Sequence, residues 1–436
     1  MFALAQFREK IRKKKARIGI IGLGYVGLPL AVAFAKKGFF VTGIDVERQR
    51  VKKLNEGVSP ILDISSRELK SLLRSKRFHA TTDHAALSLQ DAILVCVPTP
   101  LKHSEKPDIS YIMRATKEIV RTLRKGQLIV LESTTYPGTT EEKMLPRMES
   151  KGLKVEKDFF LAFSPERVDP GNKAHTTISI PKVVGGIGPL STCAAQILYG
   201  SVLHKVVPVS SAKTAEMVKL LENAFRSINI GFVNELAIIC HKLKVDVWEV
   251  IEAAKTKPFG FMPFYPGPGI GGHCIPIDPL YLSWKSNRHG YREKMIRLAS
   301  HINGSMPTQV GRRIDHLLKK RGVPMGKSSI LLLGIAYKKD VDDYRESPSL
   351  DVMKYLSRKG AKVSYSDPFV SRVPLGRKVF SSRDLTPTLL KKHHCVVVLT
   401  DHSTFDYPAV VKHARLILDT RNVLRKYNPS KNLFFL

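Results

Sequence analysis

Apolar and polar positions in the first half of the chain form short β-branched runs separated by amphipathic stretches. The runs RIGIIGL, FFVTGIDV, DAILVCVPT, QLIVLEST and FFLAFSP predict strands, and the stretches between most of them predict helices. Strands that alternate with helices in this way form a parallel sheet that is covered on both faces. We therefore expect a doubly wound α/β domain over residues 1–212.

A helical period replaces this alternation from about Thr214 to Leu243. Its apolar positions recur three or four residues apart, at Met217, Val218, Leu221, Phe225, Ile228, Phe232, Leu236 and Ile239. A helix of this length either ties two domains together or packs against a second subunit. A Pro/Gly-rich loop at 258–279 follows, and we assign residues 213–306 to a central helical domain.

The alternation restarts after about Pro307, where SSILLLGIAY, AKVSYSDP, HHCVVVLT and ARLILDT predict further strands. A chain of 436 residues is too long for one ordinary domain. The predicted fold class is α/β, with two Rossmann-like doubly wound domains at 1–212 and 307–436. The central helical domain, with its long helix, joins them.

Residues 18–35 are almost wholly apolar and follow a lysine run, which imitates a signal segment. Gly19, Pro29 and a G-x-G-x-x-G pattern inside this run favour a strand, a turn and a helix instead. No other segment approaches the roughly 20 apolar residues that a membrane-spanning helix needs. We expect a cytoplasmic protein that does not insert into a membrane.

The chain is strongly basic, with 71 Lys and Arg against 38 Asp and Glu and a net charge of +33. This excess suits anionic partners: nucleic acid, an anionic membrane surface or small phosphorylated ligands. The basic residues are spread along the chain, with one cluster from Arg12 to Arg17, and no aromatic–basic platform or helix-turn-helix pattern accompanies them. We expect no nucleic-acid partner; that competing hypothesis predicts binding with a steep salt dependence.

Gly22, Gly24 and Gly27 form a G-x-G-x-x-G pattern between a predicted strand and a predicted helix. The first glycine permits a tight turn, the second lets the backbone approach a pyrophosphate, and the third allows close helix–strand packing. Asp45 ends the next predicted strand, where a carboxylate accepts ribose hydroxyls and repels a 2′-phosphate. The pattern predicts NAD rather than NADP, and Arg50 is a candidate to cover the adenine or the pyrophosphate.

Only one of the five cysteines lies in a Gly/Pro-rich loop, namely Cys274 in GPGIGGHCIPID. Cys96 and Cys395 lie in apolar runs and are expected to be buried strand residues, while Cys193 and Cys240 lie in helix-like stretches. No C-x-x-C pair occurs, so no metal site is expected. Cys274 is the candidate nucleophile, and an inert cysteine in a tight loop is the alternative.

Asp278 follows the candidate nucleophile by four residues, so a carboxylate is available to activate water against a thioester. His273 is adjacent to Cys274 in sequence, but neighbouring side chains usually diverge. Lys219 and Asn223 are four residues apart and share one face of the long helix. They are either a pair that stabilises an oxyanion or part of a solvated polar face.

Polar residues also follow three of the predicted strands. Glu166 and Arg167 lie in SPERVDPGN, Thr99 follows ILVCVP, and Ser133 and Thr134 follow LIVLE. The carboxyl ends of strands line the ligand crevice of a doubly wound fold. These residues are therefore expected in the crevice.

The blocks GLGYVGLPLA, CVPTP, ESTTYPGTT, FSPERVDPG, AEMVKLLENAFRSINIGFVNE, GPGIGGHCIPIDP and GIAYKKDVDDYRESPS occur in this order. They resemble the blocks of the UDP-glucose/GDP-mannose dehydrogenase family, from about residue 17 to 425. The resemblance implies an NAD-dependent oxidoreductase of polysaccharide biosynthesis that converts the C6 CH2OH of a UDP-sugar to a carboxylate. PFYPGPGIGGHCIPIDPLYLSWK is most similar to the branch that oxidises UDP-N-acetylglucosamine.

The resemblance implies a four-electron oxidation in which two NAD molecules are used in succession at one site. Cys274 adds to the aldehyde to give a thiohemiacetal, and a second oxidation gives a thioester that water hydrolyses. The implied catalytic residues are Cys274, with Lys219 and Asn223 for the oxyanion, Asp278 for the cysteine and the water, and Glu166 and Thr134 for water or proton transfer.

The resemblance also implies the binding residues. Those expected at NAD are Gly22, Gly24, Tyr25, Val26, Gly27, Asp45, Arg50, Pro98, Thr99, Ser133, Thr134 and Arg345. Those expected at the substrate are Glu166, Arg167, Lys219, Asn223, Tyr265, Gly271, Lys338 and Arg421, with the UDP moiety on the distal α/β domain. The family tends to dimerise through its central helices, so a homodimer or higher homo-oligomer is expected.

Two positions differ from the UDP-glucose branch of the family. Pro170 stands where that branch carries a second glutamate, and Ile277 stands where it carries a lysine. Both changes are usual in the N-acetylhexosamine branches, and they put more weight on Arg167. UDP-N-acetylglucosamine is the favoured substrate, with UDP-N-acetylmannosamine and UDP-glucose as alternatives. A two-electron dehydrogenase of the β-hydroxyacid type, which needs no cysteine, is the competing class of enzyme.

Overall fold

The computed structural model describes residues 2–61, 64–101, 106–167, 178–272, 274–427 and 430–436. Pro170 and His273 lie outside these described residues. The contacts divide the chain into two compact units. Unit 1 is Met1–Glu222 with Trp284–Tyr291, and unit 2 is Asn223–Ser283 with Arg292–Leu436.

Unit 1 is built on an eight-stranded sheet with the order β3-β2-β1-β4-β5-β6-β7-β8. The strands are β1 (Arg17–Ile21), β2 (Phe40–Ile44), β3 (Phe78–Thr81), β4 (Ala92–Val95), β5 (Leu128–Leu131), β6 (Phe160–Phe163), β7 (Lys182–Gly186) and β8 (Val206–Pro208). The expectation of parallel pairing is confirmed from β3 to β6, but β7 runs antiparallel to β6. The run KVVGG of β7 was not predicted as a strand, because it ends in two glycines, which are poor strand formers.

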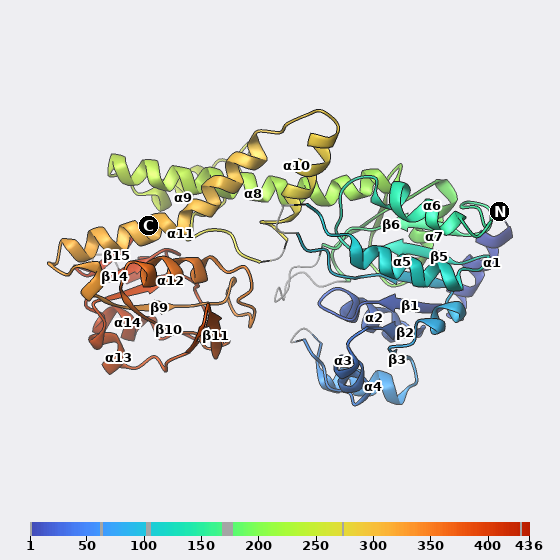
Figure 1. Ribbon diagram of the computed structural model, residues 1–436, viewed down its shortest axis with the longest axis horizontal. Helices are drawn as coiled ribbons and strands as arrows, with labels where there is room; N and C mark the ends of the chain where they lie inside the picture. The colour runs from blue at the N-terminus through green and yellow to red at the C-terminus, as the bar shows by residue number, and fades with distance from the viewer. Residues whose placement is uncertain (1, 62–63, 102–105, 168–177, 273, 428–429) are drawn as a thin grey trace. The chain divides into compact units, whose positions relative to one another are not determined.

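The helices of unit 1 are α1 (Phe2–Arg12), α2 (Gly27–Lys36), α3 (Arg48–Asn55), α4 (Ser66–Arg74), α5 (Ser110–Thr122), α6 (Leu145–Glu149) and α7 (Pro189–Gly200), as labelled in Figure 1. Two short turns of other helix types, at His84–Leu89 and Thr140–Met144, complete it. The strand order reverses between β1 and β4. In a doubly wound fold, the carboxyl ends of the strands at such a reversal form the ligand crevice.

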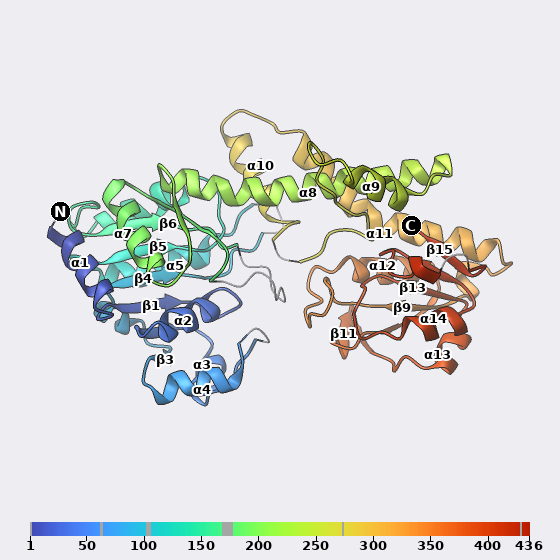
Figure 2. The ribbon, with the colours of Figure 1, turned by 180° about the vertical axis from the view of Figure 1, so that it is seen from behind.

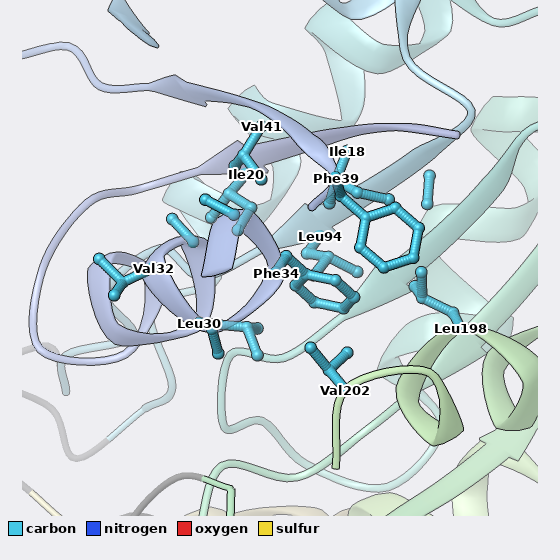
Figure 3. Packing of buried hydrophobic residues seen from close by; sticks show 14 of the residues in the cluster. Ile18, Ile20, Leu30, Val32, Phe34, Phe39, Val41, Leu94, Leu198 and Val202 are labelled. Atoms are coloured by element: carbon cyan, nitrogen blue, oxygen red, sulfur yellow. The ribbon is translucent and has the colours of Figure 1, made fainter. Parts of the chain in front are cut away.

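Apolar clusters cover both faces of the unit 1 sheet. Figure 3 shows part of the first, in which the rings of Phe34 in α2 and Phe39 meet edge to face with centroids 5.8 Å apart. Along β4, Leu94 belongs to this cluster, whereas Ile93 and Val95 belong to the cluster on the other face. Because helices cover both faces, β4 is buried at all four positions, and its sequence is continuously apolar rather than alternating.

The predicted long helix is α8 (Ala212–Leu243), and it begins two residues earlier than expected. The large apolar residues of its predicted stripe are mostly exposed: Met217, Leu221, Phe225, Phe232 and Ile239 have exposed fractions of 41–62%. A smaller residue packs closely instead, because a Cβ added to Gly231 would lie 3.1 Å from Ala299. Among the helices of the described ranges, none has the length and apolar character needed to cross a bilayer.

Unit 2 contains a parallel sheet with the order β10-β9-β13-β14-β15. Its strands are β9 (Ser329–Leu333), β10 (Lys362–Ser366), β13 (Cys395–Val398), β14 (Ile417–Asp419) and β15 (Leu433–Phe435), and β11 (Arg372–Leu375) and β12 (Lys378–Ser381) form a separate hairpin. The helices that begin in this unit are α9 (Val247–Lys255), α10 (Asp278–Arg288), α11 (Met295–Lys319), α12 (Pro348–Arg358), α13 (Pro387–Lys392) and α14 (Tyr407–His413).

The expected domain start at Pro307 falls inside α11, which packs beside α12 (Figure 2). Helical periodicity continues on both sides of the proline, and Met306 and Val310 are both buried. The second alternation of strands and helices therefore begins only at β9.

Asp367 follows β10 as Asp45 follows β2, so the two sheets carry an acid at the same place. The Oδ2 atom of Asp367 accepts the N–H groups of Ile335 at 2.6 Å and Ala336 at 2.9 Å, and it lies 3.1 Å from Nε2 of His402. Its Oδ1 atom accepts two backbone N–H groups of the turn that follows. This carboxylate is thus surrounded by donors from its own unit.

Gly304 and Gly311 in α11 form a matched test of packing. A Cβ added to Gly304 would meet no atom within 4 Å, whereas one added to Gly311 would lie 2.2 Å from the ring of Tyr355. Gly304→Ala should raise the free energy of unfolding by up to about 1 kcal/mol, because alanine is the better helix former. Gly311→Ala should lower it by about 1–3 kcal/mol, because the ring must move. Thermal unfolding of both variants checks this, and equal midpoints would contradict it.

Candidate active site

The glycine turn after β1 has the geometry that its pattern predicts. Gly22 has a φ of +93°, and an added Cβ there would lie 2.5 Å from the carbonyl oxygen of Cys96. A Cβ on Gly27 would lie 1.9 Å from the carbonyl oxygen of Gly22. At Gly24 an added Cβ would meet nothing within 4 Å. Packing therefore requires glycine at positions 22 and 27. At Gly24, open space remains in which a pyrophosphate can approach the backbone.

Asp45 is buried directly after β2 and is held against this turn. Its Oδ2 atom accepts the N–H of Leu23 at 2.9 Å, and its Oδ1 atom accepts the N–H of Glu47 at 3.0 Å. Arg50, considered above for the adenine or pyrophosphate, donates to Oδ2 at 2.9 Å instead. A carboxylate has about four acceptor positions, so Asp45 can still accept a ribose hydroxyl. The turn, the acid and the N-terminus of α2 together fit NAD.

The expected residues of the turn after β1 and of the loops after β4 and β5 lie in unit 1 with different exposures. Pro98 and Tyr25 are exposed, and Val26, Thr99 and Thr134 are half-buried. Ser133 is buried, and its hydroxyl donates to the carbonyl oxygen of Val97 at 2.7 Å. Ser133 thus ties the loop after β5 to the loop after β4, a role that its position in the sequence did not predict.

Glu166 follows β6 and is half-buried. Its carbonyl oxygen accepts the ammonium of Lys219 in α8, with Nζ 2.5 Å away. Lys219 is only 7% exposed, so its charge is held within unit 1. This contact fixes the lysine on the backbone of the Ser-Pro-Glu loop.

Arg167, considered above for the substrate, is held by protein groups. Its guanidinium donates to both carboxylate oxygens of Glu222, at 2.6 and 3.3 Å, and to the carbonyl oxygen of Pro181 at 2.6 Å. A paired guanidinium of this kind is geometrically fixed. Arg167 would have to share these donors with a substrate.

The loop after β5 is also held by Glu216 of α8, which the sequence analysis did not single out. Its carboxylate is buried and accepts the N–H of Gly138 at 2.5 Å, and the N–H and hydroxyl of Thr140 at 2.9 and 2.7 Å. Burial raises the pKa of Glu216 to about 7, and the nearby charge of Glu142 adds to the rise. In the sequence, Glu216 could have been identified as an acid three residues before Lys219, on the same face of the predicted long helix.

The raised pKa of Glu216 predicts a pH dependence of stability. In the unfolded chain this carboxyl ionises near pH 4.5, so the folded state binds more protons between pH 4.5 and about 7. The contribution of Glu216 to the free energy of unfolding should therefore fall as pH rises through that window, by at most about 3 kcal/mol. Glu216→Gln removes this titration. Unfolding midpoints of both proteins at pH 5 and pH 8 test it, and parallel pH profiles would contradict it.

The five cysteines differ in exposure, and Cys96, which was expected to be buried, is not fully buried. Cys274 is exposed, Cys240 and Cys395 are buried, and Cys96 and Cys193 are half-buried. The expectation that Cys96 is a strand residue was wrong, because β4 ends at Val95. Burial raises the pKa of the Cys395 thiol to about 12 and that of Cys96 well above its usual value. Cys274 is thus the most exposed of the five cysteines.

In unit 2, a tight turn connects Cys274 to α10. The carbonyl oxygen of Cys274 accepts the N–H groups of Ile277 at 3.1 Å and Asp278 at 2.8 Å. The Asp278 side chain is 3% exposed, and its Oδ2 atom accepts the side-chain amide of Asn223 at 2.5 Å. These backbone contacts join Cys274 and Asp278 in one turn. Asn223, which was expected to stabilise an oxyanion, donates one of its amide hydrogens to this carboxylate.

Glycines let the Cys274 loop approach the segment after β9. A Cβ on Gly271 would lie 2.8 Å from the Cβ atom of Tyr337, and one on Gly272 would lie 2.8 Å from its ring. At the start of the loop, a Cβ on Gly267 would lie 2.8 Å from Nη1 of Arg421. Arg421 is anchored by donating from Nε to the carbonyl oxygen of Leu399 at 2.7 Å. Gly271 lies within this loop, and Arg421 lies close to its start. Both were expected at the substrate.

The other expected residues of unit 2 are more dispersed. The hydroxyl of Tyr265 donates to Glu252 in α9 at 2.7 Å, and its ring stacks on Trp248 with centroids 6.1 Å apart. Arg345 is exposed and paired with Asp343 at 2.8 Å, and Lys338 is half-buried.

Two buried asparagines that the sequence analysis did not identify hold the Cys274 loop in unit 2. The side-chain oxygen of Asn234 in α8 accepts the N–H of Gly267 at 2.9 Å. Its amide donates to Asn303 in α11 at 2.9 Å, and the Asn303 amide donates to the carbonyl oxygen of Ser227 at 3.0 Å. In the sequence, Asn234 could have been identified as a polar residue among the apolar positions of the predicted long helix.

Sequence models of three domains match most of the chain. All three are described under the UDP-glucose/GDP-mannose dehydrogenase family. They are its NAD binding domain at residues 16–203, its central domain at 213–305 and its UDP binding domain at 331–426.

Relatives match over almost their whole length. A UDP-N-acetyl-D-glucosamine 6-dehydrogenase of Pseudomonas aeruginosa is 35% identical over 400 residues, which is 90% of this chain and 92% of the relative. A UDP-N-acetyl-D-mannosamine dehydrogenase of Pyrococcus horikoshii is 34% identical over 417 residues, which is 94% of this chain and 96% of the relative. The solved structure of a UDP-D-ManNAc dehydrogenase from Pyrococcus horikoshii matches with a TM-score of 0.87 at 33% identity, covering 96% of this chain and 98% of that one.

Proposed function

Because this chain belongs to the UDP-glucose/GDP-mannose dehydrogenase family, we propose that it oxidises the C6 hydroxyl of a UDP-N-acetylhexosamine to a carboxylate. The observation that carries this proposal is Cys274, which is exposed in a turn that leads to the buried carboxylate of Asp278. A thiol that can bond the carbon at the aldehyde level allows one enzyme to reach the acid.

The proposed chemistry assigns each residue a separate task. The Cys274 thiolate adds to the C6 aldehyde, a C–S bond forms, and the carbonyl electron pair moves to oxygen, where Lys219 and Asn223 stabilise it. Bound NAD⁺ supplies the electron acceptor for each of the two oxidations. Water, held by Glu166 and Thr134, then attacks the thioester carbon. Asp278 assists the water, and the C–S bond breaks to return the thiolate.

UDP-N-acetylglucosamine is the favoured substrate, and UDP-N-acetylmannosamine is the second candidate. Relatives with both activities in their names match at 35% and 34% identity. Ile277, in place of the lysine of the UDP-glucose branch, supports an N-acetylated sugar. Its N–H donates to the carbonyl oxygen of Cys274, so its backbone belongs to the nucleophile's turn.

Counting NADH tests the proposal directly. Purified protein is given NAD⁺ and, separately, UDP-N-acetylglucosamine, UDP-N-acetylmannosamine and UDP-glucose. We expect two NADH per sugar consumed, with the fastest turnover on UDP-N-acetylglucosamine. One NADH per sugar would indicate a two-electron dehydrogenase, and no NADH with any of the three would overturn the proposal.

We also propose a homodimer formed through α8. On the unit 2 part of this helix, Phe225, Phe232, Ile239 and Leu243 are 46–68% exposed and recur at helical spacing. A continuous row of exposed large apolar side chains is typical of an interface.

Phe232→Glu should convert the dimer to monomers at micromolar concentration, because a charge would be buried in the interface. Val379→Glu is the matched control, since Val379 is 67% exposed on the hairpin strand β12, outside α8. Sedimentation velocity of both variants provides the measurement. A Phe232→Glu protein that sediments like the wild type would refute this interface.

A further inference from the structure

A buried ion pair lies in unit 1 at the carboxyl ends of β5 and β6. Glu132 follows β5 directly and is fully buried, and Lys182, the first residue of β7, is 8% exposed. The Lys182 ammonium donates to one carboxylate oxygen of Glu132, and the hydroxyl of Tyr199 in α7 donates to the other. The Lys182 Nζ atom also lies 5.4 Å from the centre of the Tyr199 ring.

The same lysine reaches the backbone of the Ser-Pro-Glu loop. Its Nζ atom donates to the carbonyl oxygen of Pro165 at 3.2 Å, while Lys219 donates to the next carbonyl oxygen, that of Glu166, at 2.5 Å. Beside them, the Ser164 hydroxyl donates to the carbonyl oxygen of Val183 in β7 at 2.8 Å. The ammonium groups of Lys182 and Lys219 therefore hold two consecutive peptide carbonyls, one before and one after the Cα atom of Glu166.

A buried ion pair is a poor way to stabilise a core, because desolvating both charges offsets most of their attraction. Burial opposes both charges: it raises the pKa of Glu132, whereas at Lys182 the carboxylates of Glu132 and Glu166 outweigh burial and raise the pKa. The ammonium of Lys182 therefore stays charged. It lies between Glu132, which anchors it, and Glu166, which belongs to the candidate site. Its third contact, with the Pro165 carbonyl, ties this charge to the loop that carries Glu166.

We propose that Lys182 is a positioning residue for Glu166: Glu132 and Tyr199 anchor its ammonium, and the ammonium fixes the Pro165 carbonyl and so the place of the Glu166 side chain. This inference rests on the proposed function only for its kinetic readout. The contacts that carry it lie entirely within unit 1.

The test separates positioning from stability with a double variant. Lys182→Met alone leaves the Glu132 carboxylate buried without its partner and is expected to unfold more easily. Lys182→Met with Glu132→Gln removes both charges and should recover the wild-type unfolding midpoint. If Lys182 positions Glu166, kcat in this double variant stays at least about 10-fold below wild type with KM values within about twofold, because misplaced catalytic groups cost rate. Lys182→Arg, which keeps a cationic donor, should recover part of kcat.

Lys10→Met is the matched control. Lys10 pairs with Asp91, which directly precedes the amino end of β4 in the middle of the same sheet, with an Nζ–Oδ1 distance of 2.7 Å. Its loss should leave kcat unchanged. A double variant with wild-type kcat and wild-type stability would overturn the inference.

Hydrogen exchange provides a readout that needs no substrate. The peptide covering residues 160–167 should exchange faster in the double variant than in the wild type, although the two unfold at the same midpoint. If the wild type turns over no UDP-sugar but this exchange still changes, the proposed function fails and the positioning role stands. If turnover is normal and neither exchange nor kcat changes in the double variant, the positioning role alone fails.

Discussion

Cys274→Ser is expected to lower uronate formation by at least about 10³-fold. A serine hydroxyl is almost wholly protonated at neutral pH, whereas a thiol is partly ionised, so the variant lacks the nucleophile for the aldehyde. The oxidation from alcohol to aldehyde does not require the thiol. We therefore expect the variant to release at most one NADH per sugar, and the aldehyde should be trapped by hydroxylamine.

Cys193→Ser is the control for Cys274→Ser. Cys193 is half-buried in α7, and none of the proposed roles uses it, so this variant should retain full turnover. Product analysis by mass spectrometry gives the ratio of aldehyde to acid. Wild-type acid production by Cys274→Ser would rule out the thioester route and leave the two-electron class as the better account.

Gly24→Ala is expected to weaken NAD binding by about 10- to 100-fold, the equivalent of about 1.4–2.7 kcal/mol, without unfolding the protein. The Cβ of the alanine would meet no protein atom within 4 Å, so the free protein has no strain to relieve. That Cβ would instead occupy the open space through which the pyrophosphate approaches the backbone. Isothermal titration with NAD⁺ measures the loss.

Gly27→Ala separates the two uses of glycine in the same turn. Its Cβ would lie 1.9 Å from the carbonyl oxygen of Gly22, so the turn and α2 have to shift. Loss of folded protein, seen as a lower unfolding midpoint, should therefore precede any measurement of affinity. If Gly24→Ala bound NAD⁺ as tightly as the wild type, the cofactor would have to approach this turn differently from the family pattern.

The interior strands were predictable, because a strand with helices on both faces reads as a continuous apolar run. β4 and β5 show this pattern at every position. β11, β12 and β15 were missed, because their burial is partial and their runs are three or four residues long. Periodicity over so few residues does not distinguish a strand from a turn.

The stripe along α8 shows a different limit. The helical period was predicted correctly, but Phe232 and Ile239 are exposed, whereas Ala237 and Cys240 are buried. Periodicity reports that a helix has an apolar face and does not say what covers that face. The side that packs within the chain carries small residues, because Gly231 allows a close approach to α11.

Candidate site residues were easier to name than to place. Gly22 and Gly24 lie in the turn after β1, and Asp45 directly follows β2, so short strand-end segments of the sequence determined their geometry. Asn223 and Arg167 depend on partners 55 residues away in the chain. Spacing along a single helix or loop cannot reveal such long-range partners, and both residues are held by carboxylates that the sequence did not associate with them.

Asp367 limits how many cofactors this chain can carry. Its two oxygens face four backbone N–H groups and His402, which exceeds the roughly four acceptor positions of a carboxylate. No lone pair is left for a ribose diol at the second sheet, although its topology repeats that of the first. Saturation with NAD⁺ should therefore occur at one equivalent per chain. In the proposed four-electron reaction, the reduced cofactor would then have to leave between the two oxidations of each sugar.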